Sequence, residues 1–320
     1  MIEVKNLTKR YGSHLALDDI SFSVAEGEIL GFLGPNGAGK STTMNIMTGY
    51  IACTEGDVQI GGIDIVEEPE RAKLQIGYLP EAPPVYGDMR VDEYLNFVAA
   101  IKRVKRSERR QMLEDIKRAV HIEDMSKRLI KNLSKGYRQR VGMAQAMVGY
   151  PKVIIMDEPT VGLDPKQIIE MRDVVRSLGK QHTVILSSHI MQEVSAVCDR
   201  VMIINRGKIV ASDTPERLST NLTQGGKMSV RIKGEREQIA AALADYPVIR
   251  EVTALSSREP GTYDFELAGS ENEDIREIIF TCMSANNLPI LGMKSLDLSL
   301  EEIFLQLTEE SEEMQEEEPA

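Results

Sequence analysis

The hydrophobic pattern of the first two-thirds of the chain switches repeatedly between two forms. Apolar runs within 28–34, 152–159 and 182–188 predict buried strands. After each run, apolar residues recur at helical spacing, as in KSTTMNIMTGY at 40–50. Strands that alternate with helices are typical of a parallel sheet with helices packed on it, so the pattern predicts an α/β fold from residue 30 to about 205.

Other segments depart from this alternation. Before residue 28, apolar and polar residues alternate, which predicts further strands. Helical periodicity runs from about 82 to 150 and predicts a helical insert. A polar stretch at 216–227 resembles a linker. After it, the order strand, helix, strand, strand, helix, strand indicates a small ferredoxin-like α+β domain, followed by a short helix at 299–308.

Charge is distributed unevenly along these segments. The whole chain carries 38 Lys and Arg against 50 Asp and Glu, a net charge of −12. Residues 229–320 hold 7 of the basic and 21 of the acidic residues, so the acidic excess belongs to the last third. The sequence EESEEMQEEEPA at 309–320 predicts an acidic disordered tail. An acidic chain is a poor general binder of nucleic acid, so we expect no nucleic-acid partner.

Cysteine, histidine and hydropathy exclude several other classes. The three cysteines (Cys53, Cys198 and Cys282) are far apart, and the 4 histidines have no paired spacing, so we expect neither a disulfide framework nor a zinc site. No apolar run approaches the roughly 18 residues that cross a bilayer, and the first residues lack a signal-peptide core. These features favour a reduced, cytosolic protein.

The strongest chemical signal is the sequence GPNGAGKST, which follows a predicted buried strand and precedes a predicted helix. It fits the phosphate-binding loop G-x-x-x-x-G-K-[ST], whose glycines let backbone N–H groups surround phosphate oxygens. In such a loop Lys40 reaches the β- and γ-phosphates and the hydroxyl of Ser41 binds Mg²⁺. The predicted nucleotide-binding residues of this loop are Gly34, Pro35, Asn36, Gly37, Ala38, Gly39, Lys40, Ser41 and Thr42.

Two acids end the predicted strand at 152–159. Asp157 is placed to hold Mg²⁺ through water, and Glu158 is placed to polarise a water that attacks the γ-phosphate. A solvated strand end is the alternative for an isolated pair of acids, but the pair occurs in a chain that also has a phosphate-binding loop.

The sequence NLSKGYRQRV at 132–141 begins a further predicted helix with Ser134 as its cap. Cations are poorly placed at a helix start, whereas an anion is well placed there. Gly136 allows close approach of a ligand to the backbone. The pattern therefore predicts an anion at this helix start, with an ordinary helix cap as the alternative.

Together these motifs resemble the nucleotide-binding subunit of an ATP-binding-cassette (ABC) transporter over about residues 1–225. The segment LSKGY is similar to the family signature Leu-Ser-Gly-Gly-Gln, which grips the γ-phosphate of ATP held by the opposite subunit. The resemblance implies a P-loop NTPase cassette with an antiparallel β subdomain and a helical subdomain at about 82–150. The expected domains are the ATPase domain at 1–220, the accessory α+β domain at 221–308 and the acidic tail at 309–320.

The resemblance assigns roles to further residues. Tyr11 matches the aromatic residue that stacks on adenine, with packing at a strand end as the alternative. Asp164 matches the loop that communicates between the two sites, and His189 matches the switch histidine at the γ-phosphate. The residues expected to be catalytic are therefore Glu158, His189 and Lys40. The residues expected at the metal are Ser41, Asp157 and Glu81.

Three positions depart from the family pattern. Lys135 replaces a glycine and Tyr137 replaces the glutamine of the signature, while Ser134, its phosphate-contacting residue, is kept. Glu81 stands where the family has a glutamine that contacts Mg²⁺ and water, so it adds a negative charge near the triphosphate.

The function implied by the resemblance is ATP hydrolysis that powers a separate permease, and the subgroup is similar to bacterial multidrug, sodium and gliding-motility exporters. The expected ligands are ATP and Mg²⁺. The expected partners are a second cassette and a permease that docks on residues 82–100, which places the chain on the cytoplasmic, inner face of the cell membrane. A soluble regulatory cassette and a cassette that acts on DNA or ribosomes are the alternatives.

Overall fold

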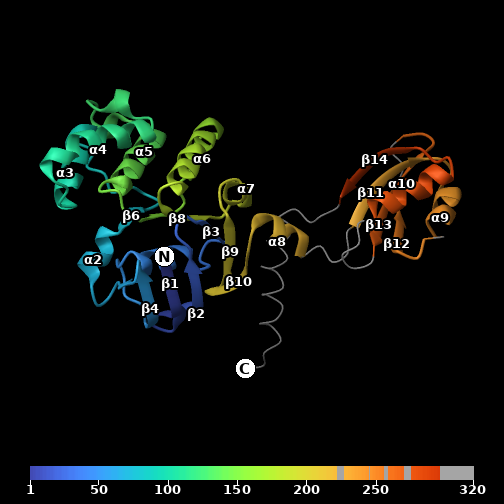
Figure 1. The fold of residues 1–320 in the computed structure, drawn as a ribbon, viewed down its shortest axis with the longest axis horizontal. Coiled ribbons are helices and arrows are strands. Elements are labelled where there is room, and N and C mark those ends of the chain that lie inside the picture. Colours follow the sequence, from blue (N-terminus) through green and yellow to red (C-terminus); the bar gives the residue numbers. More distant parts are fainter. Residues whose placement is uncertain (222–226, 245, 256–258, 270–274, 296–320) are drawn as a thin grey trace. The chain divides into compact units, whose positions relative to one another are not determined.

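The computed structural model describes residues 1–221, 227–244, 246–255, 259–269 and 275–295. The chain divides into two compact units, one formed by Met1–Pro215 and a second that begins at Glu216 (Figure 1). In the described part of the chain, no helix is both long and apolar enough to cross a membrane.

A six-stranded sheet with the order β10-β9-β3-β8-β7-β6 organises the first unit. Its strands are β3 (Ile29–Leu33), β6 (Ile76–Leu79), β7 (Val153–Met156), β8 (Thr183–Ser188), β9 (Arg200–Asn205) and β10 (Lys208–Asp213). All neighbours are parallel except β9 and β10, which form an antiparallel hairpin. Strands β3, β7 and β8 are buried at every position, which explains the apolar sequences of β3 and β7 and the apolar centre of β8.

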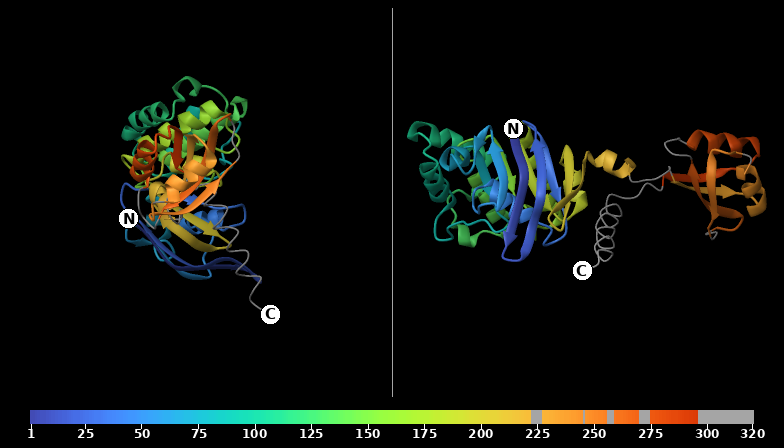
Figure 2. Two further views of the ribbon diagram at one scale, coloured as in Figure 1. Left: turned by 90° about the vertical axis from the view of Figure 1, so that its right-hand side faces the viewer. Right: turned by 90° about the horizontal axis from the view of Figure 1, so that it is seen from below.

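A second, antiparallel sheet with the order β2-β1-β4-β5 confirms the predicted β subdomain. Its strands are β1 (Ile2–Tyr11), β2 (His14–Val24), β4 (Glu55–Ile60) and β5 (Ile63–Asp64). Alternate residues of β1, including Ile2 and Val4, point into a core that also contains Leu30 and Phe32 of β3. The two sheets therefore share one hydrophobic core, and Figure 2 shows them side by side within the first unit.

Helices connect these strands as the periodicity predicted. They are α1 (Lys40–Met47), α2 (Pro69–Leu74), α3 (Val91–Ile101), α4 (Arg106–Ala119), α5 (Lys135–Met147), α6 (Pro165–Gly179) and α7 (Met191–Ser195), with short 3₁₀ turns at Glu123–Met125 and Ile130–Asn132. Helices α3, α4 and α5 follow β6 and precede β7 in the sequence. They pack on one another and form the predicted helical insert. Helix α5 contacts β6, while α6 and α7 pack against the central strands.

The second unit contains an antiparallel sheet with the order β12-β13-β11-β14 and two helices. Its elements are β11 (Lys227–Lys233), α9 (Arg236–Ala244), β12 (Ile249–Ala254), β13 (Thr262–Gly269), α10 (Arg276–Ala285) and β14 (Ile290–Ser295). This succession and strand order agree with the predicted ferredoxin-like arrangement. Residues such as Phe265 and Ile279 form a core of its own.

The predicted linker at 216–227 is wrong in its first half, where helix α8 (Pro215–Asn221) forms. Proline is well suited to the first position of a helix, and Leu218 is buried with only 4% of its surface exposed. One apolar residue in a polar stretch was too weak a periodic signal to predict this helix. The short helix expected at 299–308 and the tail at 309–320 lie outside the described residues.

Candidate functional site

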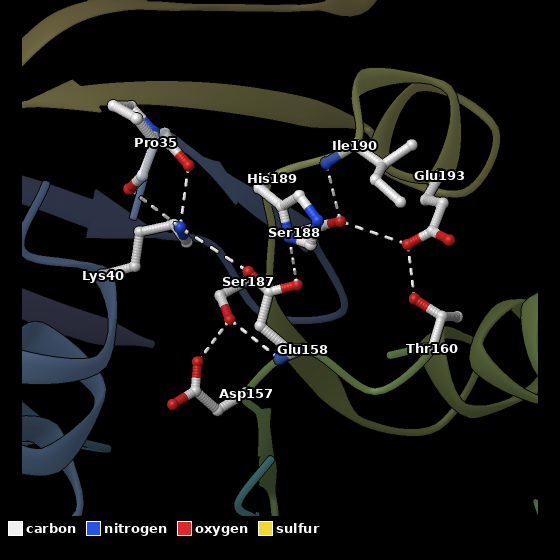
Figure 3. A network of polar contacts seen from close by, with 11 residues as sticks. Pro35, Lys40, Asp157, Glu158, Thr160, Ser187, Ser188, His189, Ile190 and Glu193 are labelled. Carbon is white, nitrogen blue, oxygen red and sulfur yellow. Dashed lines mark hydrogen bonds and ion pairs between the residues drawn. The ribbon is translucent and has the colours of Figure 1, made fainter. Parts of the chain in front are cut away.

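The loop between β3 and α1 is folded around the side chain of Lys40. The Lys40 ammonium donates hydrogen bonds to the carbonyl oxygens of Gly34, at 2.7 Å, and Pro35, at 3.2 Å (Figure 3). Only 5% of the Lys40 surface is exposed. The loop therefore holds a buried positive charge beside the first turn of α1, where backbone N–H groups favour an anion.

Two glycines of this loop have backbone conformations that other residues adopt at a cost. Gly37 has a φ of 83° and Gly39 a φ of 111°. A Cβ atom on Gly39 would lie 2.7 Å from the side chain of Leu17 and 2.9 Å from the carbonyl oxygen of Ala16. Gly39 caps α1 without a side chain, and no acidic residue lies in the first turn of the helix. The loop is consequently shaped by its backbone, as the motif predicted.

Glu158 lies directly opposite this loop, just beyond the end of β7. Its Oε1 is 3.5 Å from the ammonium of Lys40, and its Oε2 is 2.9 Å from Nδ1 of His189. The backbone N–H of Glu158 donates to Oγ of Ser187 at 2.9 Å. A φ of 47° turns the Glu158 backbone away from the strand direction, and 7% of the residue is exposed. Two neighbours therefore orient a buried carboxylate toward the phosphate-binding loop.

Asp157 has a separate set of contacts. The hydroxyl of Ser187 donates to its Oδ1 at 2.5 Å, and 5% of Asp157 is exposed. Asp157, Ser41 and Glu81 all line one large groove of about 1040 Å³. A carboxylate and a hydroxyl are the hard oxygen donors that Mg²⁺ prefers, and they fit an ion whose other ligands are phosphate oxygens and water.

A cavity of about 500 Å³ brings most of the predicted nucleotide-binding residues together. The site residues predicted from the sequence that line this cavity are Tyr11, Pro35, Asn36, Gly37, Gly39, Lys40, Ser41, Thr42, Glu81, Glu158 and His189. Gly34 and Ala38 belong to the same loop but are turned toward the core, and a Cβ atom on Gly34 would clash with the backbone of Ile204.

The same cavity contains three residues that the sequence did not indicate, His14, Ala16 and Val161. His14 pairs with Tyr11 across the tight turn between β1 and β2, so both side chains reach the mouth of the cavity. The ring of Tyr11 is half exposed, and the ammonium of Lys9 lies 5.0 Å from its centre. The turn itself was visible in the sequence at Gly12, but the pairing across it depends on the register of β1 and β2.

The signature-like residues lie elsewhere in the same unit, with Ser134 and Asp164 exposed and Gly136 buried. Ser134, Gly136 and Asp164 do not line the cavity. Ser134 caps α5 by accepting a hydrogen bond from the N–H of Tyr137 at 3.4 Å, and Asp164 caps α6 by accepting one from Gln167 at 2.9 Å.

The segment around Ser134 and the loop before α6 are in contact with each other. A Cβ atom on Gly136 would lie 2.5 Å from the side chain of Gln167, and the space beside Gly162 is filled by the ammonium of Lys135. Gly162 has a φ of 70°, so this loop is also shaped around a glycine. The replacement of a signature glycine by Lys135 is therefore accommodated by packing of the lysine side chain on Gly162.

A buried polar network joins the segments that carry Glu158 and His189. Glu193 of α7 accepts hydrogen bonds from the hydroxyls of Thr160 and Ser188, the latter at 3.1 Å. The Ser188 hydroxyl in turn accepts from the N–H of Ile190 at 3.0 Å (Figure 3). These contacts fix the loops after β7 and β8 relative to each other. No local pattern predicted this network, because its members come from two segments about 30 residues apart in the chain.

Comparison with known sequences identifies the family. A sequence profile described as "ABC transporter" matches residues 17–161. The uncharacterized ABC transporter ATP-binding protein YhcH of Bacillus subtilis is 32% identical over 319 residues, which cover 98% of this chain and 97% of YhcH. The chain belongs to the ABC transporter ATP-binding proteins. It is an ATP-binding, ATP-hydrolysing transporter subunit, and not one of the regulatory or nucleic-acid-acting cassettes that the sequence also allowed.

Two further relatives of this ATP-binding subunit extend the comparison. The linearmycin resistance ATP-binding protein LnrL of Bacillus subtilis is 29% identical over 96% of this chain and 98% of its own length. A solved structure of the ATP-binding cassette MJ0796, dimeric and bound to ADP and Pi in a post-hydrolysis state, is 25% identical with a TM-score of 0.61. It covers 67% of this chain and 98% of the cassette. The predicted cassette fold is thereby confirmed.

Proposed function

We propose that two copies of this subunit bind two ATP molecules between them and hydrolyse them at composite sites. The observation that carries the proposal is the separation of the site residues within one chain. The phosphate-binding loop, Glu158 and His189 line the cavity, whereas Ser134 and Gly136 do not. Ser134 is exposed at the start of α5, and Gly136 is buried beside Gln167. An anion at the start of α5 therefore has to come from a second chain. The dimer formed by the cassette MJ0796 with ADP and Pi supports this arrangement.

The nucleotide would be held by one chain as follows. The backbone N–H groups of the loop and the ammonium of Lys40 bind the phosphates, and the exposed ring of Tyr11 stacks on adenine. Ser41 and Asp157 would hold Mg²⁺, with Glu81 at the rim of the same groove. When bound, Mg²⁺ neutralises charge on the phosphate oxygens. The partner chain contributes Ser134 and Gly136 at the γ-phosphate and Asp164 at the boundary of the two sites.

Glu158 and His189 are the residues that act on the attacking water and the γ-phosphate during hydrolysis. Glu158 is held by Lys40 on one side and His189 on the other, so its carboxylate is positioned to accept a proton from the attacking water. His189 is 2.9 Å from Glu158 at the mouth of the cavity, where it contacts the γ-phosphate and orients the carboxylate. Loss of the γ-phosphate removes the anion that joins the two chains, and the pair opens.

The groove of about 1040 Å³ is the surface we assign to a separate membrane permease. It is lined by residues of the predicted docking segment at 82–100, among them Tyr86, Tyr94 and Phe97. Tyr86 and Phe97 are exposed. Ser41 and Asp157 line the same groove, so a permease segment in it would lie close to the nucleotide site. This places the subunit at the inner face of the cell membrane.

Export is the transport direction we assign. LnrL is named as a linearmycin resistance protein, and resistance to an external compound fits removal of that compound from the cell. The similarity covers nearly the full length of both chains, including the second unit.

The mass of Glu158→Gln in solution tests the composite site. We expect a monomer without nucleotide and a dimer with Mg-ATP, measured by light scattering, because the variant binds ATP without cleaving it. Adding Ser134→Phe should abolish the ATP-dependent dimer. The matched control, Ser177→Phe, changes an exposed serine on α6 and should leave the dimer intact. A mass that ignores ATP, or a dimer that tolerates Ser134→Phe, would contradict the proposal.

A further inference from the structure

The junction between α3 and α4 carries an unusual concentration of positive charge. Six of the nine residues from Lys102 to Arg110 are Lys or Arg, and only Glu108 is acidic, in a chain whose net charge is −12. The structure places this segment at the end of α3 and the first turn of α4, away from the nucleotide cavity (Figure 1). None of these cations lines the nucleotide cavity, and only Lys102 among them lines the groove that contains Ser41 and Asp157.

Most of these cations are directed into solvent. The side chains of Arg103, Lys105 and Arg110 are 76%, 80% and 91% exposed. Each is 3.2–3.5 Å from one carboxylate, those of Glu70, Glu108 and Glu114 respectively. Exposed pairs of this kind are screened and weak, so these cations can exchange a carboxylate for another anion at little cost. We call Arg103, Lys105, Arg106 and Arg110 the basic rim.

Apolar side chains are exposed directly beside the basic rim. Ile101 is 64% exposed, Tyr150 50% and Leu74 46%. Tyr150 and Leu74 line a shallow hollow of about 860 Å³ together with Arg103 and Lys105. A surface that mixes Lys and Arg with aliphatic and aromatic side chains suits the headgroup region of an anionic bilayer, where the cations meet phosphates and the apolar groups reach the acyl boundary.

The basic rim is continuous with the groove assigned to the permease. The side chain of Lys102 lines both the hollow and the groove, and its ammonium donates to the carbonyl oxygen of Ile76 at 2.6 Å. Because the permease lies in the membrane, a groove that receives it has to face the bilayer, and the adjoining rim faces the bilayer with it. This step rests on the proposed function.

We propose that the basic rim binds the phosphate headgroups of anionic phospholipids and so helps to hold the subunit against the inner membrane surface beside its permease. Two features support lipid rather than an acidic protein segment. The cations spread over the end of one helix and the start of the next, and exposed apolar residues lie beside two of them, Arg103 and Lys105. The wall of the hollow that they share also contains Glu108 and Asp115. The contact is electrostatic and should weaken as salt rises.

Flotation of the full chain with lipid vesicles tests this proposal. The probes are vesicles of phosphatidylcholine alone and vesicles with about 30% phosphatidylglycerol, at roughly 0.1 M salt. We expect binding to the anionic vesicles only, and its loss at high salt. The variant Arg103→Gln/Lys105→Gln/Arg106→Gln should lower the partition coefficient at least about tenfold, since each cation near such a surface contributes to binding.

A matched control removes the same charge from another part of the helical insert. Lys127→Gln/Arg128→Gln/Lys131→Gln alters three exposed cations that line neither the groove nor the hollow, and it should keep the binding of the unaltered chain. Equal binding to neutral vesicles, no binding to anionic ones, or full binding by the rim variant would each overturn the proposal. The ATP-dependent dimer of Glu158→Gln needs no lipid, so failure of the composite site would appear in that measurement instead.

Discussion

The two units of this chain have the same kind of architecture but differ in the side chains that they bury. Each packs helices on a sheet around an apolar core. Among the described residues, however, every buried polar or charged side chain but that of Thr262 belongs to the first unit. The described charges of the second unit are at most partly buried, as in the pair of Arg231 with Asp264 at 2.7 Å. The hydrogen bond to Asp264 and its charge hold the pKa of Arg231 above its usual value.

This difference indicates which of the two units carries the charged residues of the candidate site. A buried charge is costly unless it is paired, and Lys40, Asp157 and Glu158 are all buried and all paired at one edge of the parallel sheet. A fold that needed only stability would replace them with apolar groups. The second unit has no such cluster of buried charges among its described residues.

The largest effect that would test this comparison is on turnover. Glu158→Gln should lower ATP hydrolysis at least about a hundredfold, because it removes the base while keeping the shape of the side chain. The release of phosphate measures the rate. Glu266→Gln, the same change on β13 of the second unit, should leave the rate unaltered. Equal losses in both variants would mean that the two units do not differ as described.

The next effect is on the free energy of unfolding, through backbone strain at one glycine in each unit. Gly39→Ala combines a left-handed φ with contacts to Leu17 and Ala16, so it should lower the free energy of unfolding on the order of 1–3 kcal/mol. It should also weaken ATP binding. Gly261→Ala in the second unit has a φ of 71° but open space around it, and should cost about 1 kcal/mol. Chemical denaturation measures the free energy of unfolding, and nucleotide titration measures the affinity for ATP. A Gly261→Ala variant that impairs ATP binding would show that the two units do not act separately.

A smaller effect is expected at Glu81, the acid that replaces the family's glutamine. Glu81→Gln should tighten ATP binding by about threefold to tenfold, since it removes a negative charge from the wall of the phosphate cavity. A fluorescent ATP analogue reports the affinity. Glu67→Gln removes an exposed carboxylate that lines neither the cavity nor the groove, and should have no effect. Weaker binding by Glu81→Gln would instead make Glu81 a ligand that the site needs.

The smallest effect concerns the stability of the first unit at high pH, where the phenol of Tyr78 ionises. Burial raises the pKa of Tyr78 from 10.0 to about 12. The unfolded chain therefore loses this proton first, so the contribution of Tyr78 to stability is present below pH 10 and is lost between about pH 10 and pH 12. Denaturation across this range should show a shallower decline for Tyr78→Phe, and an unchanged slope would show that Tyr78 ionises as freely as in the unfolded chain.

Much of the site could be predicted because its parts are local. The phosphate-binding loop is one continuous segment whose glycines and lysine act on neighbouring backbone, so the sequence contains nearly all of its geometry. The central strands could also be predicted, because each of these buried strands contains a continuous apolar run. Helix α8 was missed because its periodic signal rests on Leu218 alone.

By itself, the sequence determined the parallel α/β fold, the loop around Lys40, the two acids at the end of β7 and the cap of α5. Only the tertiary structure decided which of these meet. Glu158 reaches His189 because β7 and β8 are parallel neighbours that end at the same edge of the sheet, and Lys135 packs on Gly162 because α5 and α6 start side by side. Contacts between distant segments depend on strand order and packing, which no local pattern of residues specifies.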